Sequence, residues 1–163
     1  MSWNDFYQRQ QALAEVLDSA RRDLSAAFET VPGPFRDIDE LLAALHRKWM
    51  LQLTGRVEVA LTDTDAAPHG DRVEAVTAAW RRTAQDNPGL RAALDVHAGS
   101  PALQDVTARE HRMLAIAAGL AEEHEPPQDA ARVGRAFVQL LRAAPDSDRH
   151  ARPGRLRRLI PSF

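Results

Sequence analysis

The chain has 163 residues, no cysteine and a formal net charge of −2, with 44% hydrophobic and 27% charged residues. This length predicts one domain with a sizeable core, and the composition excludes a largely disordered chain. The absence of cysteine excludes disulfides, thiolate metal sites and cysteine nucleophiles. Because the chain has no long apolar run and no leader-like N-terminus, we expect a cytoplasmic protein without a membrane span.

The first predicted element is a long N-terminal helix from Trp3 to Thr30, for which Ser2 is a suitable N-cap. Its single apolar stripe at helical spacing consists of Phe6, Leu13, Leu17, Leu24 and Phe28. Prolines and a glycine at 31–34 separate it from the rest of the chain. This helix either covers the remaining bundle or pairs with a second chain, which would make the protein a homodimer.

Two further helices are predicted from Ile38 to Leu61, with Asp37 as the N-cap, and from Asp71 to Asp86. The inward stripe of the first consists of Ile38, Leu41, Leu42, Leu45, Trp49, Leu53, Val57 and Leu61. That of the second consists of Val73, Val76, Ala79, Trp80 and Thr83. A polar loop over 62–70 separates the two helices, so we expect them to pack side by side.

Proline and glycine divide the remaining chain into a short helix that includes Leu90 and His97, a helix from Pro101 to Glu123, and a helix from Gln128 to Ala144. In the last helix we expect Val133, Ala136, Phe137, Leu140 and Leu141 to point inward. The sequence therefore predicts an all-α fold, a five- to six-helix antiparallel bundle over residues 1–145, with the 38–61 and 101–123 helices at its centre. A basic, flexible tail over 146–163 is expected to follow.

Glu110 is the most informative polar residue, because it lies on the apolar stripe of its helix between Val106 and Met113. A carboxylate at such a position is either paired or has a raised pKa. One interpretation is a ligand anchor or general base, which could act with His46 or His111. The other is a buried salt bridge to an arginine on a facing helix.

Aromatic and methionine side chains on the inward stripes suggest where a ligand could lie. Trp49, Trp80 and Met113 could line an apolar cavity with His46 and His111 beside it, or they could simply fill the core. No pair of histidines or of histidine and glutamate has the i, i+3 or i, i+4 spacing of a helical metal site, so no metal is assigned. No nucleotide-binding glycine loop or nucleophile elbow is present, and no cofactor or catalytic residue is assigned.

The C-terminal segment from Arg149 to Phe163 has five arginines and no acid, which leaves 16 basic and 23 acidic residues in the rest of the chain. We expect this segment to contact a protein partner through Arg152, Arg155, Arg157, Arg158 and Phe163. Nucleic acid is disfavoured as a partner because the body is acidic. The remaining basic residues include only one lysine, which we interpret as the codon usage of a GC-rich bacterial genome.

The helical rhythm of residues 80–97 and 110–141 resembles the C-terminal ligand-sensing domain of TetR-type regulators, without their DNA-binding module. This resemblance implies a small-molecule sensor or a partner-binding bundle. The leading interpretation of the sequence is a non-enzymatic protein-interaction or regulatory module. Small-molecule sensing comes second, and a helical-bundle enzyme that uses Glu110 with a histidine comes third.

Overall fold

The computed structural model describes residues 1–144, and it confirms the all-helical bundle. Its elements are α1 (Trp3–Arg22), the 3₁₀ turn η1 (Ala26–Phe28), α2 (Ile38–Asp65), α3 (Arg72–Asp86), α4 (Pro88–Val96), α5 (Pro101–Ala117) and α6 (Pro127–Ala143). The part of the chain that is described contains no strand. The predicted tail and its five contact residues lie outside the described residues, so the domain boundary at 145 stays a prediction.

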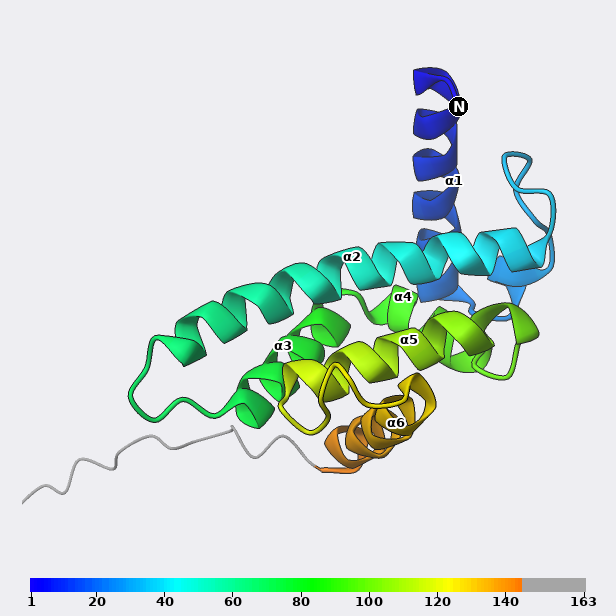
Figure 1. Cartoon of the computed structure of the whole chain (residues 1–163). Helices are drawn as coiled ribbons and strands as arrows, with labels where there is room; N and C mark the ends of the chain where they lie inside the picture. The colour runs from blue at the N-terminus through cyan, green and yellow to red at the C-terminus, as the bar shows by residue number, and fades with distance from the viewer. Residues whose placement is uncertain (145–163) are drawn as a thin grey trace, which may run out of the picture.

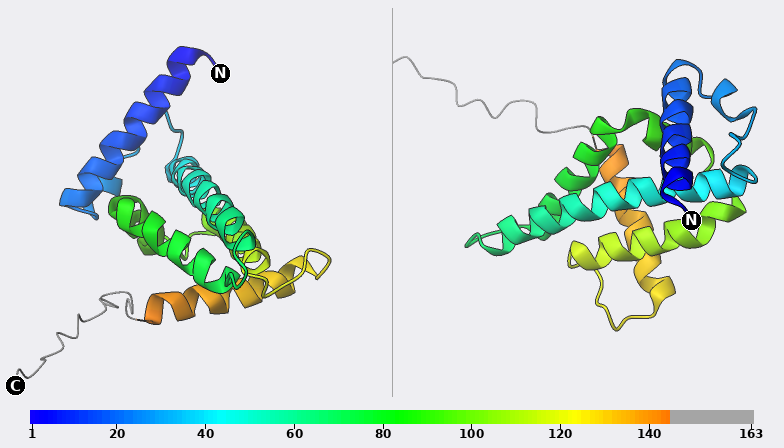
Figure 2. Two further views of the ribbon diagram at one scale, coloured as in Figure 1. Left: turned by 90° about the vertical axis from the view of Figure 1, so that its left-hand side faces the viewer. Right: turned by 90° about the horizontal axis from the view of Figure 1, so that it is seen from above.

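The longest helix, α2, runs through the molecule and contacts α1, α3, α4 and α5 (Figure 1). Its inward side chains include Leu41, Leu45, Trp49 and Leu53, none of which is accessible to solvent. The most extensive contact between two helices is that of α5 with α6. Figure 2 shows that α1 and α6 cross the direction of α2 and α5 steeply instead of running along them.

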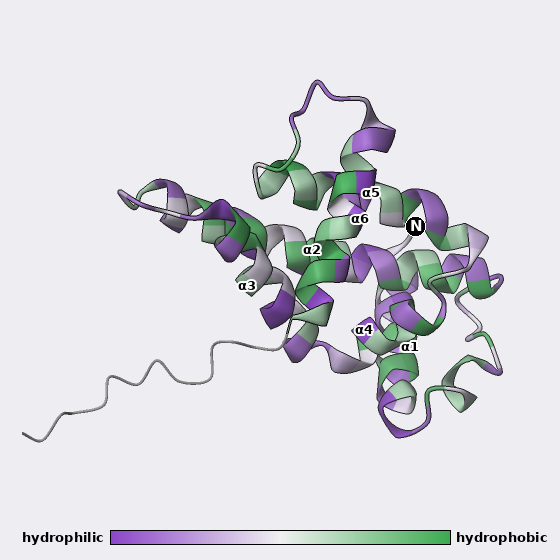
Figure 3. Ribbon diagram, turned by 90° about the horizontal axis from the view of Figure 1, so that it is seen from below, coloured by the Kyte–Doolittle hydropathy of each residue, from purple (hydrophilic) through white to green (hydrophobic). Residues whose placement is uncertain are grey.

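Each helix carries both apolar and polar residues, which Figure 3 shows in green and purple. This is the pattern of helices that bury one face and expose the other. None of the helices within residues 1–144 has both the length and the apolar character of a membrane span.

The N-terminal helix is shorter than predicted because Asp23 ends it. Asp23 has an extended backbone, and its side chain accepts hydrogen bonds from the backbone N–H groups of Ser25 and Ala26 at 3.0 and 3.1 Å. This local turn competes with the continuation of the helix. The apolar residues Leu24 and Phe28 still pack against the core, so the stripe continued past the end of the helix.

The fifth helix ends at Ala117, six residues before the predicted Glu123. Gly119 has a φ of +71°, and the N–H groups of Gly119 and Leu120 bond to the carbonyls of Ile116 and Ala115. This is a Schellman motif, in which a left-handed residue satisfies the last carbonyls of a helix. Glycine adopts this conformation without the penalty that a side chain would impose.

Several residues that were expected to point inward are exposed: Val73, Val133, Ala136 and Leu140. On α6 the contact with the bundle is centred on Gly134, Phe137 and Leu141. Val133 and Leu140 each precede a residue at this centre, and one residue turns a helix by about 100°, away from the contact.

Candidate functional site

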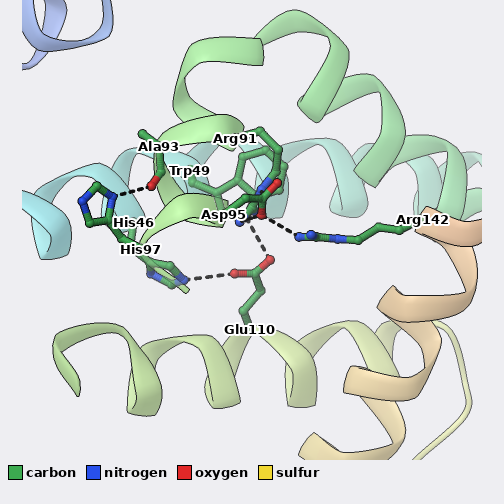
Figure 4. A network of polar contacts seen from close by, with 8 residues as sticks. All are labelled: His46, Trp49, Arg91, Ala93, Asp95, His97, Glu110 and Arg142. Carbon is green, nitrogen blue, oxygen red and sulfur yellow. Dashed lines mark hydrogen bonds and ion pairs between the residues drawn. The ribbon is translucent and has the colours of Figure 1, made fainter. Parts of the chain in front are cut away.

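The centre of the candidate site is the Glu110 carboxylate, which α5 directs toward α2 (Figure 4). Its Oε1 accepts a hydrogen bond of 2.9 Å from Trp49 Nε1, and its Oε2 lies 3.0 Å from His46 Nε2. All three side chains are buried, and Glu110 is only 4% exposed. The carboxylate is therefore buried and paired, as in one of the two interpretations, but its direct partners are a tryptophan and a histidine instead of an arginine.

Arg91 on α4 provides the nearby positive charge. Its guanidinium lies 4.6 Å from the centre of the Trp49 ring, in a cation–π contact, and its Nη2 is 2.9 Å from Asp95. Asp95 also binds Arg142, which reaches across from α6 at 3.0 Å (Figure 4). A chain of ion pairs therefore connects α4 with α6 beside the buried carboxylate.

The pKa of Glu110 is lowered although the group is buried. Burial alone would raise this pKa, because it penalises the charged form. The hydrogen bond from His46, the charge of Arg91 and the hydrogen bond from Trp49 outweigh that penalty. Glu110 is therefore ionised at neutral pH, with both oxygens occupied by N–H donors, and it anchors α5 against α2.

A hollow of about 540 Å³ opens beside this network, between α4, α5 and α6. Arg91, Arg135 and Arg142 give it three cations, against two acids, Asp95 and Glu110. The rest of its lining consists of His46, Leu94, Ala98, Leu103, Gln104, Thr107, Ala108, His111, Val138 and Gln139. Its walls therefore combine positive charge, neutral hydrogen-bonding groups and apolar side chains.

Burial and the surrounding charges together set the direction in which the pKa of His111 is shifted. Its pKa is lowered, first by partial burial, while the charge of Glu110 acts in the opposite direction. Arg135, Arg142 and Arg91 lower it further by repulsion of a second cation. His111 is accordingly a neutral imidazole at neutral pH, able to donate or accept a hydrogen bond.

The six residues that the sequence indicated as ligand-binding occupy two environments. His46, Glu110 and His111 line the hollow. Trp49 and Trp80 are buried core residues, with ring centres 5.8 Å apart in an edge-to-face arrangement, and Met113 packs on the core. None of these last three lines the hollow, whose walls are more polar than the expected apolar cavity.

Sequence reasoning missed the three arginines of the hollow as a group. Arg135 and Arg142 are seven residues apart, which places them on the same face of α6. Arg91 and Asp95 have the i, i+4 spacing of a helical ion pair. These spacings were visible, but only the packing of α4 against α5 and α6 brings the two helices' arginines together.

Within residues 1–144 no group of three or more His, Asp or Glu side chains is arranged to hold a metal ion. Comparison with models of known families, with curated proteins and with solved structures found no match to this chain. The resemblance to TetR-type ligand domains thus remains one of helical rhythm.

Proposed function

We propose that this protein is a regulatory module that binds a small organic anion in the hollow between α4, α5 and α6. This is the second of the three functions expected from the sequence, with the ligand changed from apolar to anionic. The observation that carries the proposal is the gathering of Arg91, Arg135 and Arg142 around one half-enclosed space.

Two of these arginines have unused binding capacity. Arg91 Nη1 is buried without a hydrogen-bond partner, and Arg135 forms no ion pair with any described residue. Guanidinium groups bind carboxylates and phosphates through charge-assisted hydrogen bonds. An anion in the hollow would pair with Arg135 directly and with Arg91 once that guanidinium turns toward the hollow, and Gln104 and Gln139 could donate to its remaining oxygens.

The apolar part of the lining favours a ligand with a hydrocarbon portion over a bare inorganic ion. Leu94, Leu103 and Val138 belong to the core, and each also lines the hollow. Transfer of apolar area from water to these side chains contributes about 25 cal/mol per Å². Short-chain or aromatic carboxylates combine a negative charge for the arginines with a hydrocarbon portion for the apolar side chains.

A bound anion would also change the contacts that hold the helices together. Arg91 contacts Trp49 on α2 and Asp95 on its own helix, and Asp95 binds Arg142 on α6. An anion that draws Arg91 toward the hollow competes with these contacts. This competition is the physical basis on which we assign a regulatory role.

The test is calorimetric titration of the full chain with octanoate, octanol and inorganic phosphate. We expect octanoate to bind more tightly than either other probe, and Arg135→Gln to weaken it about tenfold, or about 1.4 kcal/mol. Arg132→Gln, three residues earlier on α6 and outside the hollow, is the matched control. Equal binding of octanol, or equal loss in the two variants, would contradict an anion site at this place.

A further inference from the structure

The N-terminal half of α1 carries an exposed aromatic cluster. Trp3, Phe6 and Tyr7 are 78, 44 and 63% exposed, and their ring centres lie 5.8 to 6.5 Å apart. The first fully buried residue of α1 is Ala12, and before it only Arg9 is partly buried, against Glu40 and Phe35. Figures 1 and 2 show this end of α1 standing clear of the other helices. Phe6 is on the same stripe as buried Leu13, so the stripe that packs on the core continues onto a free surface.

A groove of about 460 Å³ lies between this end of α1 and the neighbouring face of α2. Leu51, which is 79% exposed, forms part of its α2 wall, and Phe6 forms part of its α1 wall. Its full lining is Met1, Phe6, Arg9, Gln10, Leu13, Ala44, Arg47, Lys48, Leu51 and Gln52. Exposed apolar surface of this kind on two adjacent helices is typical of an interaction site.

The charges of the groove are all positive. Arg9, Arg47 and Lys48 line it, and no acidic residue does. Arg9 is paired with Glu40 at 2.8 Å. Arg47 and Lys48 form no ion pair or side-chain hydrogen bond with any described residue, so their charges are available to a partner.

We propose that this groove, lined by α1 and α2, binds an amphipathic helix of a partner protein that carries acidic residues beside its apolar face. A concave groove between two helices accepts the side-chain ridge of a third helix, whereas a bilayer presents a flat surface. A two-fold contact with a second copy would place the same patch on both sides, and Arg47 and Lys48 would then face their own counterparts. Such like charges disfavour self-pairing, while acidic residues of a partner complement them.

The probe is a synthetic helix of about 18 residues, or roughly 27 Å. It has leucine and phenylalanine at i, i+3, i+4 and i+7 spacing and glutamate on its flanks, and its matched counterpart has lysine at every glutamate position. Binding of each labelled peptide to the full chain is measured by fluorescence anisotropy. We expect the acidic peptide to bind with a Kd below about 100 µM and the basic one at least about tenfold more weakly.

Two pairs of variants assign the binding to the groove. Leu51→Gln should weaken the acidic peptide about tenfold, while Val59→Gln, an exposed apolar position on the same helix outside the groove, should not. Arg47→Gln with Lys48→Gln should reduce the preference for the acidic peptide, and Arg109→Gln with Arg132→Gln should leave it unchanged. All these side chains are at least partly exposed, and far-UV circular dichroism checks that each variant is folded.

Three results would overturn the proposal: no binding of the acidic peptide, equal binding of the two peptides, or equal loss of affinity in Leu51→Gln and Val59→Gln.

Two further measurements distinguish a partner helix from other occupants of the groove. Leu51-dependent binding of phosphatidylglycerol vesicles without peptide binding would indicate a membrane instead. Sedimentation that shows a dimer which Leu51→Gln dissociates, and which the peptide does not, would indicate a second copy. Octanoate affinity should be the same in Leu51→Gln as in the parent chain, so this surface and the anion site are tested separately.

Discussion

At the Glu110 carboxyl, burial and hydrogen bonding act on the pKa in opposite directions, and the donors determine the outcome. Glu110→Gln keeps the size of the side chain but removes its charge, and it turns an NH₂ group toward His46 or Trp49 in place of an oxygen. The amide can face His46 only if that ring accepts at Nε2, and both charge-assisted hydrogen bonds become neutral ones, so we expect the free energy of unfolding to fall by about 1–3 kcal/mol. Urea titration measures this loss, and the exposed Glu123→Gln serves as the control. A loss of equal size in both variants would show that the contacts of Glu110 add nothing to stability.

The same residue predicts a pH dependence. Because its pKa is lower in the folded chain than its ordinary value of 4.5, Glu110 contributes stability above that value and loses it as the pH falls through the folded-state pKa. The difference in unfolding free energy between the parent chain and Glu110→Gln should therefore shrink as the solution is acidified below pH 4.5. A difference that grows in acid would mean that the folded-state pKa is raised.

Part of this site could be predicted from the residues themselves. The position of Glu110 on an apolar stripe indicates burial, and His46 and Trp49 lie three residues apart on the inward face of one helix. Nothing in the sequence fixes how far α5 is shifted along α2, so the sequence left the partner of Glu110 open. For the same reason the role of Arg91 depends on tertiary packing.

Among the helices, the contact of α5 with α6 is the closest. A Cβ atom at Gly134 would lie 1.8 Å from the backbone oxygen of His111, so no side chain fits there unless the helices separate. We expect Gly134→Ala to lower the free energy of unfolding by about 1–3 kcal/mol or more, which is the usual cost of overpacking. Gly55→Ala on α2 has open space around it and should stabilise the chain by up to about 1 kcal/mol, since alanine favours a helix. Thermal unfolding of both variants distinguishes a steric effect from one of helix propensity.

Helix number and order were predictable because each helix has an apolar stripe bounded by proline, glycine or a capping residue. The ends of the helices were harder to predict, because an apolar stripe can continue beyond the last residue of its helix. Leu24 and Phe28 keep the spacing of α1 but belong to a turn that Asp23 stabilises. Gly119 ends α5, but the alanines on both sides of it favour a helix, and the helix was therefore predicted to continue to Glu123.

For the molecule as a whole, α2 separates the two proposed binding surfaces. His46 and Trp49 face the carboxylate network beside the anion site, whereas Arg47, Lys48 and Leu51 face the groove with α1. Adjacent residues of one helix point in different directions, so a single element serves both surfaces. A change in the position of α2 would therefore affect both, although neither shares a lining residue with the other.

Glu40 links α1 to the start of α2, because it accepts a hydrogen bond of 2.8 Å from Arg9 and another from the backbone N–H of Arg36. The backbone N–H of Arg36 and the guanidinium of Arg9 lower the pKa of Glu40 from 4.5 to about 2. A lowered pKa contributes stability above the ordinary value, and this contribution is lost as the pH falls from about 4.5 toward 2. We therefore expect the hydrogen-exchange protection factors of α1 to fall over this range before those of α2.

Glu40→Gln should lower the protection of α1 already at neutral pH and remove most of its acid dependence, because the group no longer titrates. The matched control is Glu15→Gln, on the exposed face of α1, where the side chain accepts a hydrogen bond from Gln11 of the same helix. Since Arg9 also lines the groove, Glu40→Gln should change the affinity for the acidic peptide, and Glu15→Gln should not. Equal protection of α1 in the two variants at neutral pH would show that the Arg9–Glu40 ion pair does not hold α1 on α2.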